Sequence, residues 1–117
     1  MSGGNWKEMF EAAETGDLAL VEFHVQRGVD INYAHPEFLS TPLVAAILAG
    51  QEAVALYLLQ AGANPDLPSE FDQATPLIAA RKAGLAAVEQ ALLARGVPPL
   101  PAEPAPPRSW LARLWRA

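Results

Sequence analysis

The chain has 117 residues, a formal net charge of −5 and no cysteine. This length suffices for one small domain, and the lack of cysteine excludes both a disulfide framework and a zinc site built on thiolates. The acidic balance argues against a nucleic-acid partner, because the phosphates would be repelled.

The N-terminal sequence predicts neither export nor membrane insertion. The opening stretch, MSGGNWKEMF, lacks the basic region and the apolar core of a signal peptide. No apolar run in the chain approaches the roughly 20 residues that a membrane-spanning helix needs. Together with the lack of cysteine, this favours a cytoplasmic location.

Residues 5–27 predict a first pair of helices that is less regular than the pairs that follow. Asn5 is a candidate N-cap, and Trp6, Met9 and Phe10 are expected to pack inward. Several acidic side chains would give this pair a polar outer face, which the end of a stacked array requires.

Two connecting segments, residues 28–40 and 67–74, predict hairpin tips and carry one phenylalanine each, Phe38 and Phe71. If exposed, each would be a candidate anchor for a partner, since aromatic side chains dominate binding hot spots. If tucked under its own tip, each would only fill space. The sequence leaves both interpretations open.

The central pair of helices has the clearest start and stop signals. Thr41 predicts an N-cap and Pro42 a first helical position, where its missing N–H is not needed. Gly50 and Gly62 are expected to end the two helices, where a left-handed residue is favoured. Within the second helix an apolar stripe recurs at helical spacing: Val54, Leu58 and Leu59.

The same signals recur at one constant spacing along the chain. Two glycine series share this period: Gly16, Gly50 and Gly84, and Gly28, Gly62 and Gly96. A period in the low thirties, such as this one, is typical of a solenoid built from stacked supersecondary units. We therefore expect an all-α solenoid of three helix-turn-helix units with short hairpin tips.

Two motifs in the repeating region resemble the ankyrin repeat family. TPLVAAILAG at residues 41–50 and TPLIAARKAG at residues 75–84 are similar to that family's Thr-Pro-Leu-His-x-Ala-Ala-x-x-Gly motif. LLQAGANPD at residues 58–66 is similar to its Leu-Leu-x-x-Gly-Ala-Asp-x-Asn motif. The resemblance implies an ankyrin-repeat domain over residues 1–96. Its three repeats would span about residues 5–36, 37–70 and 71–97.

The chain departs from the family pattern in two ways. Val44 and Ile78 replace the family's histidine, which removes its usual turn-stabilising hydrogen bond. Both tips also lack the family's turn glycine before the threonine. We therefore expect the tips to be distorted.

The last part of the chain changes character. Residues 97–107 hold six prolines and predict an extended linker, while residues 108–117, RSWLARLWRA, predict an amphipathic helix too short to be stable alone. This tail helix is expected to dock on the apolar end of the third repeat, in a partner's groove, or on an anionic membrane surface. Docking onto a second copy would give a homodimer in place of a monomer. The docking side chains would be Trp110, Leu111, Leu114 and Trp115.

The sequence predicts no enzyme, no cofactor and no metal site. It holds no glycine-rich phosphate loop, no Gly-x-Ser-x-Gly motif and no pair of histidines at helical spacing. His24 and His35 fall in different parts of the repeating pattern. We expect His24 to pack beside the helices and not to bind a ligand.

The ankyrin resemblance implies a partner protein, held at variable positions in the tips and at the ends of the first helices of the repeats. The acidic body would favour a basic partner surface. We therefore expect a non-catalytic protein–protein interaction module that acts as an adaptor or an inhibitor. The alternatives are an immunity-type inhibitor of a toxin or enzyme and a membrane-surface scaffold anchored by the tail. The implied contact residues are Trp6 and Glu14 in the first repeat, Glu37, Phe38, Ser40, Leu48 and Ala49 in the second, and Phe71, Asp72, Ala74, Lys82 and Ala83 in the third.

Overall fold

The computed structural model describes residues 5–70 and 73–100. These residues form six helices, and no strand is present among them. The helices are α1 (Trp6–Thr15), α2 (Leu18–Gln26), α3 (Pro42–Leu48), α4 (Glu52–Gln60), α5 (Pro76–Ala83) and α6 (Ala86–Ala94). The prediction of an all-α solenoid of three repeats is confirmed.

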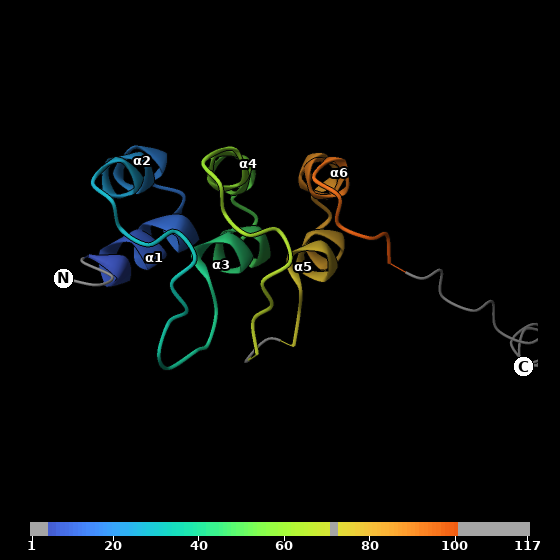
Figure 1. Cartoon of the computed structure of the whole chain (residues 1–117), viewed down its shortest axis with the longest axis horizontal. Coiled ribbons are helices and arrows are strands. Elements are labelled where there is room, and N and C mark those ends of the chain that lie inside the picture. The colour runs from blue at the N-terminus through green and yellow to red at the C-terminus, as the bar shows by residue number, and fades with distance from the viewer. Residues whose placement is uncertain (1–4, 71–72, 101–117) are drawn as a thin grey trace, which may run out of the picture.

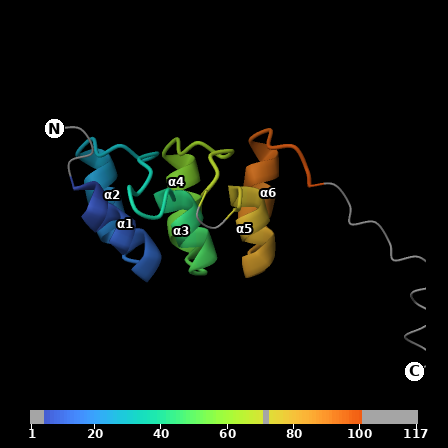
Figure 2. The same ribbon diagram turned by 90° about the horizontal axis from the view of Figure 1, so that it is seen from below.

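The helices form two layers, shown in Figure 1. One layer holds α1, α3 and α5, and the other holds α2, α4 and α6, so each repeat contributes one helix to each layer. Figure 2 shows the three helical pairs side by side. The two hairpin tips project from the layer of α1, α3 and α5, and α3 packs against both of its neighbours in that layer.

The threonine signals start α3 and α5 as predicted. Thr41 Oγ1 accepts a hydrogen bond from the Val44 N–H at 3.4 Å, and Thr75 Oγ1 accepts one from the Ile78 N–H at 3.2 Å. A proline follows each threonine at the first helical position. The two caps satisfy backbone donors that have no partner within the helix.

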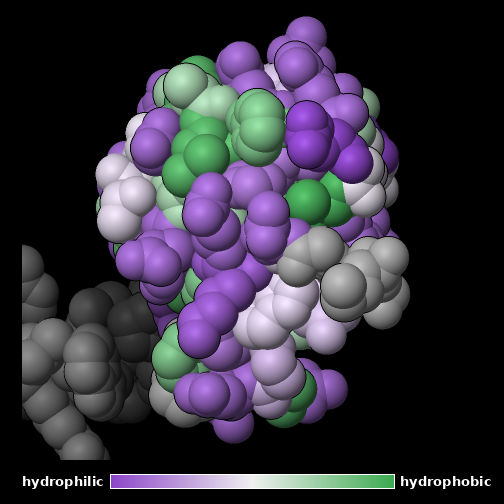
Figure 3. Space-filling model, turned by 90° about the vertical axis from the view of Figure 1, so that its left-hand side faces the viewer, coloured by the Kyte–Doolittle hydropathy of each residue, from purple (hydrophilic) through white to green (hydrophobic). Residues whose placement is uncertain are grey.

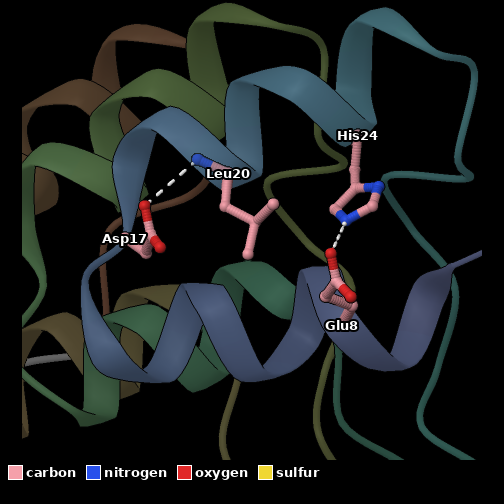
Figure 4. Close-up of polar contacts among 4 residues, drawn as sticks. All are labelled: Glu8, Asp17, Leu20 and His24. Carbon is pink, nitrogen blue, oxygen red and sulfur yellow. Dashed lines mark hydrogen bonds and ion pairs between the residues drawn. The ribbon is translucent and has the colours of Figure 1, made fainter.

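The first repeat begins differently. Asn5 stands at the N-cap position of α1, but its side chain makes no capping hydrogen bond. A cap that the sequence analysis did not anticipate begins α2, where Asp17 Oδ1 accepts a hydrogen bond from the Leu20 N–H at 3.2 Å (Figure 4). Asp17 thus caps the second helix of the first repeat, whereas the equivalent residues of the later repeats, Gln51 and Leu85, make no side-chain cap.

The core lies between the two layers and between successive repeats. The predicted stripe of Val54, Leu58 and Leu59 is buried, and Leu58 has no exposed surface. Leu43 and Ile47 of α3 are buried against the same cluster. The core extends to Val97 and Leu100, and residues 101–117 lie outside the described part of the chain.

The N-terminal end of the array has a polar outer face. Hydrophilic residues cover most of it and surround small hydrophobic groups (Figure 3). His24 takes the position of Leu58 in the next repeat and is a packing residue, as predicted, with 1% of its surface exposed. Its Nε2 lies 2.8 Å from Glu8 Oε1, so the buried ring is satisfied by an exposed carboxylate (Figure 4).

The two tips keep the same closure although they lack the family glycine. The His35 N–H donates to the Ser40 carbonyl at 2.8 Å, and the Ser69 N–H donates to the Ala74 carbonyl at 2.8 Å. The distortion that we expected from the missing glycine lies in the backbone of one residue in each tip. Leu39 and Gln73 occupy equivalent positions of the two tips, and both have a φ of +49°, in the left-handed region that side chains disfavour.

Candidate functional site

One row of exposed side chains crosses all three repeats. Glu14, Leu48 and Lys82 occupy equivalent positions of the repeats and lie near the C-terminal ends of α1, α3 and α5. All three side chains are exposed, and Leu48 is unusual for an apolar residue in having 37% of its surface accessible. The row is therefore acidic in the first repeat, apolar in the second and basic in the third.

A hollow of about 350 Å³ opens between the first tip and the helices beside it. Five of its lining residues are among the contact residues predicted from the sequence, so the fold brings together side chains that are far apart in the sequence. Its lining consists of Phe10, Glu14, Phe38, Ser40, Ala45, Leu48 and Ala49. Below, this hollow together with the row of Glu14, Leu48 and Lys82 is called the tip-side surface.

His35 organises the tip that forms one wall of the hollow. Its Nδ1 accepts hydrogen bonds from the Glu37 N–H at 3.1 Å and from the Phe38 N–H at 3.3 Å. An Nδ1 that accepts two hydrogen bonds is unprotonated, which places the ring proton on Nε2. The ring is mostly buried, with Trp6 meeting it edge-on at 5.0 Å and Phe10 at 4.9 Å between ring centroids.

Phe38 is both packed within its tip and exposed, so each of the two interpretations that the sequence left open applies in part. Its ring stacks on His35 with the centroids 4.3 Å apart and the planes 27° apart. It also remains 42% exposed and lines the hollow. The tip thus presents an aromatic ring that is held in place on one side and accessible on another.

The other residues named from the sequence fall into three groups. Trp6 and Glu37 lie outside the lining of the hollow: Trp6 is half-buried and stacks on Tyr33 at 5.2 Å, and Glu37 is exposed on the tip. Ser40 lines the hollow with little exposed surface, whereas Ala74 is buried and fills space within its own tip. Phe71, Asp72, Trp110, Leu111, Leu114 and Trp115 lie outside the described residues.

The two histidines of the chain lie outside the tip-side surface. Neither His24 nor His35 lines the hollow, and both rings are held in the structural hydrogen bonds described above. Within residues 5–70 and 73–100, no three His, Asp or Glu side chains are grouped closely enough to hold a metal ion. No helix in the same ranges is long and apolar enough to cross a membrane.

Comparisons with known proteins agree with the repeat pattern. A family model described as ankyrin repeats in three copies matches residues 9–99. The crystal structure of an ankyrin repeat domain from Acinetobacter baumannii is similar with a TM-score of 0.69 and 34% sequence identity.

That similarity covers 75% of this chain and 46% of the Acinetobacter chain, so this chain spans less than half of its relative's length. No curated protein matches the sequence. The family model nevertheless covers most of the chain, including the greater part of α1 and the whole of the other five helices. This chain belongs to the ankyrin repeat family, whose repeats generally serve as protein–protein interaction modules.

Proposed function

We propose that this chain binds another protein through its tip-side surface and catalyses no reaction. The observation that carries the proposal is the hollow with the exposed side chains of Phe38 and Leu48 on its rim. Large apolar side chains grouped in a hollow mark interaction sites, and aromatic anchors supply much of the binding energy in such sites. A role in protein interaction is also the general one for ankyrin repeats.

The contents of the surface support binding without catalysis. An enzyme needs a nucleophile or base held by a second group at the place where substrate sits. Of the described residues that line the hollow, Glu14 is the only one with a titratable side chain, and it is exposed. Such a surface can fix and orient a partner, and it supplies no pair of groups for proton transfer.

The binding could serve an adaptor or an inhibitor. An adaptor holds two partners together, whereas an inhibitor of the immunity type covers the working surface of one toxin or enzyme. The net negative charge of the chain would favour a target with a basic surface, in the cytoplasm where we expect the chain to act. The affinity of such a complex would fall with added salt. An inhibitor would lower its target's activity in proportion to its occupancy, and an adaptor would leave that activity unchanged.

The proposal is tested by affinity capture with the full chain, followed by identification of retained proteins by mass spectrometry. Phe38→Asp combined with Leu48→Asp should release the specific partner, because both changes place charge at the rim of the hollow. Phe23→Asp is the matched control, since Phe23 is 48% exposed on α2, in the other layer. The proposal would be contradicted if the Phe23→Asp variant failed to retain the partner while the double variant still retained it.

A further inference from the structure

We propose that the hollow accepts a lysine or arginine side chain of the partner, with the Glu14 carboxylate as its counter-charge. We further infer that Lys82 sets the direction of the partner, by requiring an acidic or neutral group over the third repeat. This inference rests on the proposed function and names the chemistry of the partner that the tip-side surface selects.

The walls of the hollow suit a long side chain with an apolar stem. Phe10 and Phe38 contribute two rings with centroids 6.4 Å apart, and Leu48 adds an aliphatic wall. Lysine and arginine bury their methylene groups along such surfaces while the charged head stays near water. The exposed ring of Phe38 also attracts a cation, arginine in particular.

The charge at the rim selects a cation. Among the described residues of the lining Glu14 is the one that is charged, and its carboxylate takes no part in either ion pair found among the described residues. Its backbone carbonyl accepts a hydrogen bond from Gln51 Nε2 at 3.1 Å, which ties the end of α1 to the second repeat. Glu14 therefore has a fixed backbone and an uncommitted charge.

The opposite end of the row carries the opposite charge, and it is uncommitted too. Lys82 is exposed and belongs to neither ion pair, whereas its neighbour Arg81 pairs with Glu89. A partner segment that crosses the row meets a negative charge, then the apolar Leu48, then a positive charge. The net charge of −5 alone suggests a uniformly basic partner. The row instead suggests a partner that is basic where it meets Glu14 and acidic or neutral where it meets Lys82.

The inference is tested by selecting a random peptide library displayed on phage against the full-length chain and three variants. Glu14→Lys reverses the charge at the hollow, and Lys82→Glu reverses it at the far end of the row. Glu52→Lys is the control for Glu14→Lys, because it changes the net charge by the same amount at an exposed position on α4, in the other layer. Circular dichroism verifies that each variant keeps its helices.

We expect the wild-type chain and Glu52→Lys to enrich peptides that carry a lysine or arginine beside an apolar residue. Glu14→Lys should enrich peptides with an acidic residue there, and should bind the wild-type peptides about tenfold more weakly. Lys82→Glu should add a preference for a second basic residue at the other end of the peptide. Enrichment without a basic preference, or equal effects of Glu14→Lys and Glu52→Lys, would overturn this inference and leave the proposed function standing. No enrichment with any of the four chains would count against the proposed function itself, and this inference would fall with it.

Discussion

Arg81 and Glu89 form an ion pair, with Arg81 Nη2 2.9 Å from Glu89 Oε1, across the last pair of helices. The same two positions are apolar and fully buried in both earlier repeats, each of which is followed by another repeat. These earlier residues are Ala13 and Ile47 at the first position, and Val21 and Ala55 at the second. The third repeat therefore presents charge where a fourth repeat would stack.

The turn after α6 lacks a hydrogen bond that joins the first two repeats. Between the first and second repeats, Asn32 Oδ1 accepts a hydrogen bond from the Asn64 N–H at 2.7 Å. The residue equivalent to Asn64 in the third repeat is Pro98, which has no N–H to donate. The second and third repeats therefore lack this tie, and it is the charged pair on the end face that opposes the stacking of a further repeat.

Replacing Arg81 and Glu89 by the residues found at the equivalent positions of the central repeat should make the end face of the third repeat self-associate. We expect the double change Arg81→Ile with Glu89→Ala to produce a concentration-dependent dimer, because it exposes an apolar face of the kind that is buried between repeats. Sedimentation velocity over a range of concentrations would measure it. Lys7→Ile with Glu52→Ala removes the same charges at exposed positions on α1 and α4 and should leave association unchanged. Identical behaviour of the two double variants would contradict this account of the end face.

The left-handed residues of the tips should be replaceable by glycine with a gain in stability. A non-glycine residue in this conformation costs roughly 1–2 kcal/mol, and the added flexibility of glycine in the unfolded chain costs less, about 0.5–1 kcal/mol. We therefore expect Leu39→Gly and Gln73→Gly each to raise the free energy of unfolding in urea. Both side chains are exposed, so little packing is lost. The reverse change, Gly50→Ala at a φ of +77°, should lower the free energy of unfolding. A loss of stability in both glycine variants would contradict the prediction.

The two hydrogen bonds accepted by His35 should be essential for the first tip. His35→Leu leaves the amides of Glu37 and Phe38 without their acceptor, which should cost about 1–3 kcal/mol and speed their hydrogen exchange. His35→Asn keeps a side-chain acceptor at the same place, as in an Asx turn, and should retain part of the protection of both amides. Equal exchange rates in the two variants would show that the acceptor is unimportant.

Leu58 should be the most sensitive position of the central repeat. It has no exposed surface and lies in the core cluster that joins the layers. Leu58→Ala should lower the free energy of unfolding by about 2–5 kcal/mol, and Leu58→Asp should unfold the array by burying a charge. Circular dichroism and the thermal midpoint would report both effects, with Leu56→Ala at a half-buried position as the milder control. An unchanged midpoint for Leu58→Ala would mean that the assigned core face is wrong.

Most of the fold was predictable because its signals are local and repeated. The Thr41 cap, the Pro42 start and the glycine stops each act over a short stretch of chain, and their constant period places the copies in register. The Asp17 cap was missed although it is equally local, because the equivalent residues of the later repeats, Gln51 and Leu85, make no cap and the repeat pattern does not mark this position. The charged end face was missed for a different reason. Arg81 and Glu89 look like ordinary surface charges in the sequence, and their meaning appears only when the equivalent residues of the other repeats are found to be buried.

The candidate site was predictable only in part. Positions such as Glu14 and Leu48 follow from the repeat register, since equivalent residues of stacked helices lie side by side. The role of His35 depends on a tip conformation in which one ring meets two backbone amides, and no sequence periodicity encodes that. The burial of Ala74 likewise depends on how its tip closes onto Ser69.

The claim that this chain binds a protein through the tip-side surface is tested most directly by isothermal titration calorimetry with a partner identified by capture. The account predicts that Leu48→Asp raises the dissociation constant by about tenfold or more, because it places an unpaired charge at the rim of the hollow. Phe23→Asp, on the other layer, should leave that constant close to the wild-type value. A dissociation constant that is unchanged by Leu48→Asp and raised by Phe23→Asp would place the interface elsewhere and contradict the account.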